Sequence, residues 1–155
     1  MPDKEAVLVS ACLLGLACRY DGKAKENPRV LALLEKGVRL VPVCPEQLGG
    51  LPTPRPPAEI QRDGRVLNRC GADVTAAYLR GAEEALRLAG LYRCRRAVLK
   101  ARSPSCGKGG VYDGAFAGRL IPGDGIAARL LQERGVRVFT EEELDAAFPE
   151  EDRTE

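Results

Sequence analysis

Three cysteines of this 155-residue chain occupy one kind of position, because each lies shortly beyond the end of a short apolar run. They are Cys12 after residues 6–11, Cys44 after residues 38–43 and Cys106 after residues 96–101. Thiolates are the side chains that zinc and iron–sulfur clusters prefer. No C-x-x-C pair is present, so neither a zinc ribbon nor a thioredoxin-type motif is indicated. The alternative is that these cysteines are free thiols used as small core residues.

The chain contains no histidine, and this limits the chemistry that the cysteines can support. A Ser-His-Asp or Cys-His nucleophile pair, a histidine-ligated zinc site and a histidine general base are excluded. A metal must be held by Cys, Asp or Glu, and acid–base catalysis falls to carboxylates, Lys, Tyr or thiols. Two kinds of site remain open: a zinc site with thiolate ligands, and an iron–sulfur site with one open iron.

A carboxylate and two hydroxyls stand beside two of these cysteines. Glu46 follows Cys44 in "VPVCPE", on backbone that prolines stiffen on both sides. Ser103 and Ser105 precede Cys106 in "ARSPSCGKGG", whose glycine-rich turn offers backbone N–H groups to an anion. The turn lacks the spacing of a Walker motif. We expect Glu46 to carry protons; the alternative is that it is an ordinary solvated loop acid.

The elements that position these groups alternate along the chain. Buried strands are predicted at residues 6–11, 38–43, 96–101 and 136–139. Helices are predicted at residues 28–35, 73–89, 124–134 and 141–148. This alternation predicts an α/β fold: a single open parallel sheet of about four strands with flanking helices, Rossmann-like, in one domain over residues 1–155. Ligands bind beyond the carboxyl ends of such strands, so the three thiols should reach one crevice.

The segment 49–71 does not follow this alternation. It holds four prolines between Pro52 and Pro57, which exclude a regular helix or a central strand. An irregular segment of this length is uncommon in a compact domain and is usually functional or disordered. We expect it to form a loop over the site.

The remaining cysteines are less clearly placed. Cys18 follows Cys12 by six residues and is a further candidate ligand at the same crevice. Cys94 precedes the run 96–101, so we expect it at the opposite end of the sheet in a structural role. The role of Cys70, before the long helix, is left open, with a structural role preferred.

Charge is unevenly distributed along the chain. Residues 141–155, the predicted acidic C-terminal helix and tail, carry eight acidic side chains and one basic one, which leaves 23 basic and 14 acidic residues elsewhere. A basic body suits an anionic small molecule or a nucleic acid, or is simply an ordinary basic surface. With three Phe, four Tyr and no Trp, no basic patch interleaved with aromatics favours nucleic acid.

The beginning of the chain and its apolar runs indicate where the protein works. "MPDKEAVLVSACLLG" lacks the basic start of a signal peptide, and no apolar run is long enough to span a membrane. We therefore expect a cytoplasmic protein whose six cysteines are thiols or ligands rather than disulfides.

Long blocks of the chain resemble a known family. "VSACLLGLACRYDGKAK", "VPVCPEQLGGLPTPRPPAEI", "GADVTAAY", "KARSPSCGKGGVYDGAFAG" and "IPGDGIAARLL" resemble the thiouracil desulfidases, small bacterial proteins. The likeness runs from about Val7 to Phe139, which is nearly the whole chain.

The resemblance implies an oxygen-sensitive [4Fe-4S] cluster that has no protein ligand on its fourth iron. By position, Cys12, Cys44 and Cys106 match the cluster ligands, and Glu46 with a serine, preferably Ser103, matches the acid–base pair. The implied activity is hydrolysis of a C–S bond in a thiolated pyrimidine of the thiouracil type, with release of hydrosulfide.

The implied substrate is a small thiolated nucleobase or nucleotide, and no NAD or flavin is implied. We expect either a monomer or a homodimer. The alternatives are a zinc protein or zinc hydrolase with Cys ligands, and a non-enzymatic module that binds nucleotides or thiolated RNA.

Overall fold

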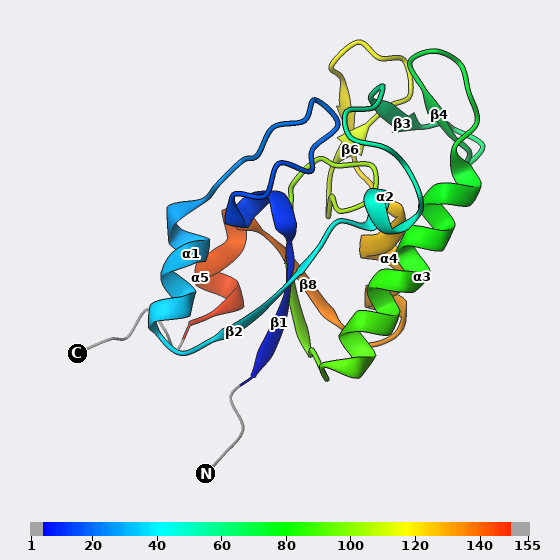
Figure 1. Ribbon diagram of the computed structural model, residues 1–155. Helices are drawn as coiled ribbons and strands as arrows, with labels where there is room; N and C mark the ends of the chain where they lie inside the picture. Colours follow the sequence, from blue (N-terminus) through cyan, green and yellow to red (C-terminus); the bar gives the residue numbers. More distant parts are fainter. Residues whose placement is uncertain (1–4, 150–155) are drawn as a thin grey trace.

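The computed structural model describes residues 5–149, and its centre is a parallel sheet of four strands (Figure 1). The strands are β1 (Ala6–Ser10), β2 (Arg39–Val43), β5 (Arg96–Leu99) and β8 (Arg137–Thr140). Their order across the sheet is β2-β1-β5-β8, and each neighbouring pair is parallel. The predicted α/β class and four-stranded open sheet are confirmed, with strand ends displaced by one or two residues.

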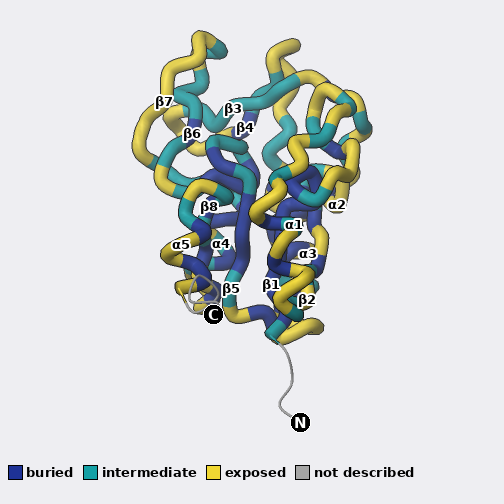
Figure 2. Tube along the Cα trace, turned by 90° about the vertical axis from the view of Figure 1, so that its left-hand side faces the viewer, coloured by how far each residue is buried: buried dark blue, intermediate teal, exposed yellow. Residues whose placement is uncertain are grey.

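Helices cover both faces of this sheet (Figures 1 and 2). On one face lie α1 (Pro28–Glu35) and α5 (Leu144–Ala147), and on the other lie α3 (Thr75–Leu91) and α4 (Ile126–Glu133). Strand β1 is buried along its whole length and contributes side chains to the core on both faces of the sheet. Val7 and Val9 pack toward α1 and α5, whereas Leu8 packs toward α3 and α4. A continuous apolar strand of this kind is typical of a parallel sheet covered on both sides.

Local capping explains where the helices begin. The Asn27 side chain accepts two backbone N–H groups at the start of α1, and Pro28 occupies the first helical position. The long helix α3 begins two residues later than predicted, because Asp73 accepts the N–H of Thr75 ahead of it. The helix predicted at 141–148 is divided into a 3₁₀ turn, η2 (Glu141–Glu143), and α5. The predicted tail beyond it, residues 150–155, lies outside the described residues.

Two small antiparallel hairpins stand beyond the carboxyl end of the sheet (Figure 1). They are formed by β3 (Ala58–Ile60) with β4 (Val66–Asn68), and by β6 (Val111–Tyr112) with β7 (Leu120–Ile121). The expectation of an irregular loop throughout 49–71 is therefore wrong for its second half. The prolines end at Pro57, and the chain beyond them is free to pair.

The strand order places a topological switch point between β1 and β5. From β1 the chain crosses through α1 to β2, and from β2 it returns through α3 on the other face to β5. The loops after β1 and β5 therefore diverge to opposite faces and leave a crevice between them, the usual ligand position in an open α/β sheet. Within residues 5–149, no helix combines the length and the apolar character needed to cross a membrane.

Candidate active site

A cavity of about 680 Å³ lies beyond the carboxyl ends of the strands, at this switch point. Its wall includes Cys12, in the 3₁₀ turn η1 (Ala11–Leu14) after β1, and Cys44, at the start of α2 (Pro45–Leu48) after β2. Cys106 reaches the same wall from the loop after β5. Cys18, from the loop that follows η1, is a fourth thiol in this lining. The structure thus brings to one cavity the three cysteines that the sequence singled out, together with the further candidate.

The thiols are crowded enough to affect one another's ionisation. A hydrogen bond with the Cys12 thiol, followed by burial and the charge of Cys12, raises the pKa of Cys18. A hydrogen bond with Cys18, followed by burial, raises the pKa of Cys44 far above its ordinary range. Burial raises the pKa of Cys106 to about 12. Neighbouring thiolates repel, so this arrangement keeps Cys18, Cys44 and Cys106 protonated unless a cation joins them.

The loop that carries Cys106 is docked on the first turn of α4. The carbonyl of Ser105 accepts the N–H groups of Ala127 (2.9 Å) and Ala128 (3.1 Å). A Cβ atom at Gly125 would lie 2.6 Å from that carbonyl oxygen, so only glycine allows this approach. The helix thus fixes the position of Cys106 through its own backbone.

The glycine-rich turn after Cys106 does not offer all of its donors to a ligand. The N–H of Gly107 donates to the carbonyl of Ser103 (2.8 Å), and the N–H of Gly109 donates to Asp124 (2.8 Å). These two N–H groups are not available to an anion, because internal acceptors occupy them.

Glu46 is held at both carboxylate oxygens. Arg55 Nε donates to Oε1 (2.8 Å), and the Ser105 hydroxyl donates to Oε2 (3.0 Å). The Ser103 hydroxyl lies 3.1 Å from that of Ser105. Because a hydroxyl has one proton to donate, the arrangement forms a chain that runs from Ser103 through Ser105 to Glu46. Tyr78 completes the surroundings: burial, followed by the charge of Glu46 and a hydrogen bond to it, raises the pKa of this phenol well above its usual range.

The two serines differ in their surroundings. Ser105 is 2% exposed, whereas Ser103 is half-buried. Ser103 Oγ also accepts the N–H groups of Ser105 (3.1 Å) and Cys106 (3.0 Å), which shapes the turn before the cysteine.

Sequence reasoning missed two of these residues, Arg55 and Tyr78. Arg55 stands alone among prolines in "PTPRPP", a placement that hints at a specific partner but does not identify it. Tyr78 fits the apolar face of α3 and gives no separate signal.

The cavity wall is predominantly basic. Its basic residues are Arg19, Lys25, Arg55, Arg69, Lys100 and Arg102, and its acidic residues are Glu46 and Glu59. Within residues 5–149, Lys25 and Arg69 have no carboxylate partner. The Arg69 guanidinium instead lies 5.7 Å from the centre of the Phe116 ring.

The two hairpins are joined over the cavity by Glu59, on β3. Its Oε1 atom accepts the N–H groups of Gly114 (2.9 Å) and Phe116 (3.1 Å) in the β6–β7 loop. Phe116 has φ = 56°, a conformation that is rare for a bulky residue. Both Glu59 and Phe116 line the cavity, so the segment after the prolines covers the site, as the sequence predicts.

The other two cysteines lie away from the cavity. Cys70 is exposed in the turn before α3. Cys94 precedes β5, at the amino end of that strand, and is buried in the core cluster on the α3 and α4 face. Burial raises the pKa of the Cys94 thiol to about 11.

Fold and cavity together define an α/β protein with a thiol-lined site that also contains a carboxylate and two hydroxyls. A family model described as 2-thiouracil desulfurase matches residues 7–143, and the chain belongs to this family. The resemblance found in the sequence is therefore confirmed.

Two similar proteins extend this comparison. The solved structure of a [4Fe-4S]-dependent thiouracil desulfidase, TudS, is 48% identical to the chain, with a TM-score of 0.86; the match covers 92% of this chain and 95% of that structure. An uncharacterized protein of Bacillus subtilis (strain 168), YbbK, is 39% identical over 148 residues, which is 90% of this chain and 97% of the relative.

Proposed function

We propose that this protein removes the sulfur atom of a thiolated pyrimidine of the thiouracil type by hydrolysis and releases hydrosulfide. A [4Fe-4S] cluster held by Cys12, Cys44 and Cys106 would be the cofactor. The observation that supports this most strongly is the convergence of these thiols and the serine–glutamate chain on one cavity.

The donor set fits such a cluster. Soft thiolates are its usual ligands, and the raised pKa values of the Cys44 and Cys106 thiols are what a bound cationic cluster would reverse. Within residues 5–149, no three Cys, Asp or Glu side chains converge tightly enough to hold a single metal ion. The zinc alternative therefore has no support in this geometry. A four-iron cluster differs, because each thiolate binds a different iron and the sulfur atoms need not meet at one point.

The cluster would supply an open iron with an affinity for sulfur. The protein's own residues would manage protons. Glu46, held at both oxygens, is placed to accept a proton from water in the cavity. Ser105 donates to Glu46 and is nearly inaccessible, so it would serve as a relay, while half-buried Ser103 is the serine that faces substrate.

The basic wall bears on the form of the substrate. Lys25 and Arg69 are not neutralised by a carboxylate within the described part of the chain. Cationic groups of this kind attract anions, so a thiolated nucleotide is proposed beside the free nucleobase. A macromolecular RNA is less well supported, because the thiols lie at the base of a cavity that the two hairpins cover.

The decisive experiment is anaerobic reconstitution of the protein with iron and sulfide, followed by a hydrosulfide assay. The panel contains 2-thiouracil, 4-thiouracil, their nucleosides and nucleoside monophosphates, and uracil as the blank. We expect a brown protein that releases hydrosulfide and leaves the oxygen-substituted base. A colourless protein that binds zinc stoichiometrically would favour the zinc alternative, and a brown protein that binds these compounds without turnover would favour a binding module.

A further inference from the structure

Arg55 is an arginine in an unusual position for a loop residue: only 9% of its surface is exposed. Each nitrogen of its guanidinium has an acceptor. Nε donates to Glu46, one terminal nitrogen donates to Thr53 Oγ1 (2.9 Å) and the Pro52 carbonyl (3.1 Å), and the other donates to the Cys18 carbonyl (3.0 Å). A planar guanidinium with fixed donor directions can satisfy such a set only in one orientation. The side chain is therefore locked.

The backbone of Arg55 also contacts the loop after η1. Its N–H donates to the carbonyl of Tyr20 (2.8 Å), so Arg55 contacts the loop after η1 twice, at Cys18 and at Tyr20. The prolines on both sides of it restrict the backbone and reduce the entropy lost on holding this conformation. Residues 52–57 thus form a strap between the loop after η1 and Glu46.

The consequence for Glu46 follows from its two contacts. Arg55 holds one carboxylate oxygen and Ser105 holds the other, so the carboxylate plane is fixed from two sides. Without Arg55, the carboxylate would be buried without its counter-charge and could rotate away from Ser105. Misplacement of a reacting group by about 1 Å can cost on the order of 10²-fold in rate.

We infer that Arg55 is a positioning residue for Glu46, and that the proline-rich strap 52–57 holds it there. The inference rests on the proposed desulfidase function. It assigns Arg55 no contact with substrate: the residue acts through Glu46.

The test is a double-mutant cycle on hydrosulfide release, with Arg55→Met, Glu46→Gln and the two combined, each at matched iron occupancy. Arg55→Met should lower kcat about 10²-fold with little change in KM, and the double variant should be no slower than Glu46→Gln alone. Arg55→Lys, which restores the charge but not the fork, should recover part of the loss. Arg80→Met is the matched control: its guanidinium also donates to a loop carbonyl, that of Gly49, but not to Glu46.

A second readout does not depend on activity. In the iron-free protein, Arg55→Met should lower Tm by about 10 °C, because a buried carboxylate loses its partner. Adding Glu46→Gln should return part of that loss, since the amide needs no counter-charge.

The outcomes separate the inference from the function it rests on. A parent that is inactive at full iron occupancy overturns the proposed function and, with it, the positioning role. An active parent with Arg55→Met within about threefold of it, far short of the expected loss, overturns the inference alone. So does a double variant much slower than Glu46→Gln, because Arg55 would then act on another group. If Arg55→Met fails to fold, Arg55→Lys decides by the same kcat criterion.

Discussion

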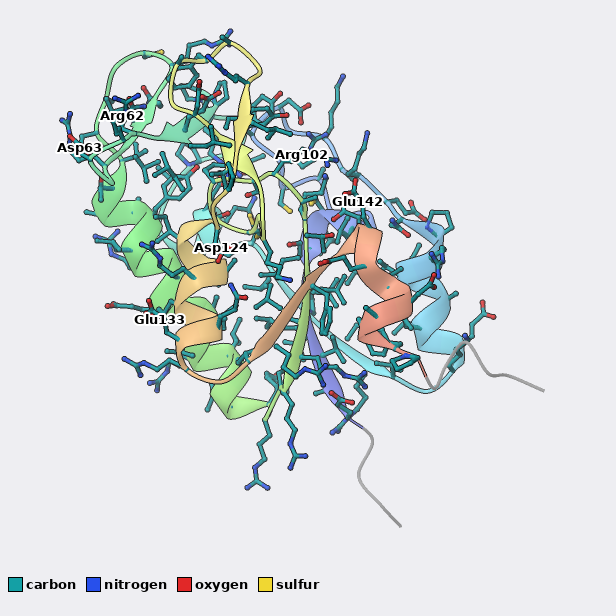
Figure 3. The ribbon with its side chains drawn as sticks, turned by 180° about the vertical axis from the view of Figure 1, so that it is seen from behind. Arg62, Asp63, Arg102, Asp124, Glu133 and Glu142 are labelled. Atoms are coloured by element: carbon teal, nitrogen blue, oxygen red, sulfur yellow. The ribbon has the colours of Figure 1, made fainter. Side chains whose placement is uncertain are left out.

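Two ion pairs at the cavity wall differ in burial. Glu46 meets Arg55 at 2.8 Å, with side chains 12% and 5% exposed. Glu142 meets Arg102, which also lines the cavity, at 3.1 Å, with side chains 58% and 38% exposed (Figure 3). The distances are similar, but the surroundings are not. Water screens the exposed pair, which is worth about 0–1 kcal/mol, whereas removing one partner of a buried pair costs about 3–5 kcal/mol.

The residue before Glu142 forms a buried pair instead. Glu141 meets Lys100 at 2.9 Å with side chains 10% and 14% exposed, and it also accepts the N–H of Ala101 (2.8 Å). The acidic run at 141–143 therefore has one buried anchor, and the pair next to it is exposed. Burial, rather than the number of charges, should decide what each substitution does.

The largest effect is expected for the thiols that line the cavity. Cys44→Ser should abolish both iron binding and hydrosulfide release, because a hydroxyl is a poor substitute for a thiolate ligand. Cys94→Ser, at the opposite end of the sheet, should retain both. The measurement is iron and sulfide per chain after anaerobic reconstitution. Equal loss of iron in the two variants would show that the cavity cysteines are not the ligands.

Glu46→Gln should follow in size. The amide keeps the shape of the side chain but accepts no proton, so turnover should fall by about 10²–10⁴-fold while iron is retained. Hydrosulfide release at matched iron occupancy measures this. A variant within about threefold of the parent, outside that range, would leave Glu46 a bystander; loss of iron together with activity would make it a ligand.

Glu141→Gln tests the buried pair with Lys100. Its carboxylate is a charged acceptor for Lys100 and for a backbone N–H, and losing such bonds costs about 1–3 kcal/mol. For a chain of this size, Tm should fall by roughly 3–8 °C. Thermal unfolding of the iron-free protein is the measurement, and an unchanged Tm would show that the Glu141 carboxylate does not stabilise the fold.

Glu142→Gln, the same substitution one residue further, should do almost nothing. The pair with Arg102 is exposed, so the change in Tm should stay within about 1–2 °C and activity should match the parent. This variant also serves as the control for Glu46→Gln. A fall in Tm as large as that of Glu141→Gln would contradict the view that burial separates the two.

Much of the fold could be predicted from the sequence, because strongly apolar runs and their glycine and proline boundaries are local signals. The same topology rule placed Cys12, Cys44 and Cys106 at one edge, since parallel strands end together. The hairpins were missed because their strands have only two or three residues each, too few for an alternating pattern to show.

The hydrogen bonds around Glu46 could not be predicted from the sequence in the same way. Arg55 and Glu46 are nine residues apart, and Ser105 meets Glu46 across 59 residues, so their pairing depends on how α2 faces the loop after β5. Sequence reasoning could name both serines, but only the structure distinguishes Ser105, which contacts Glu46, from Ser103, which is half-open to the cavity.

The hydrogen bonds of Glu59 limit which segments can be exchanged between related proteins. One carboxylate oxygen on β3 satisfies two N–H groups of the β6–β7 loop, and those groups cap a segment in which Phe116 is left-handed. A graft of residues 111–121 into a host without an acid at position 59 would leave both donors unpaired and the strained backbone unsupported. The two hairpins belong to different sheets and are separated by helix α3 and strand β5 in the chain. They should nevertheless be transplanted as one unit.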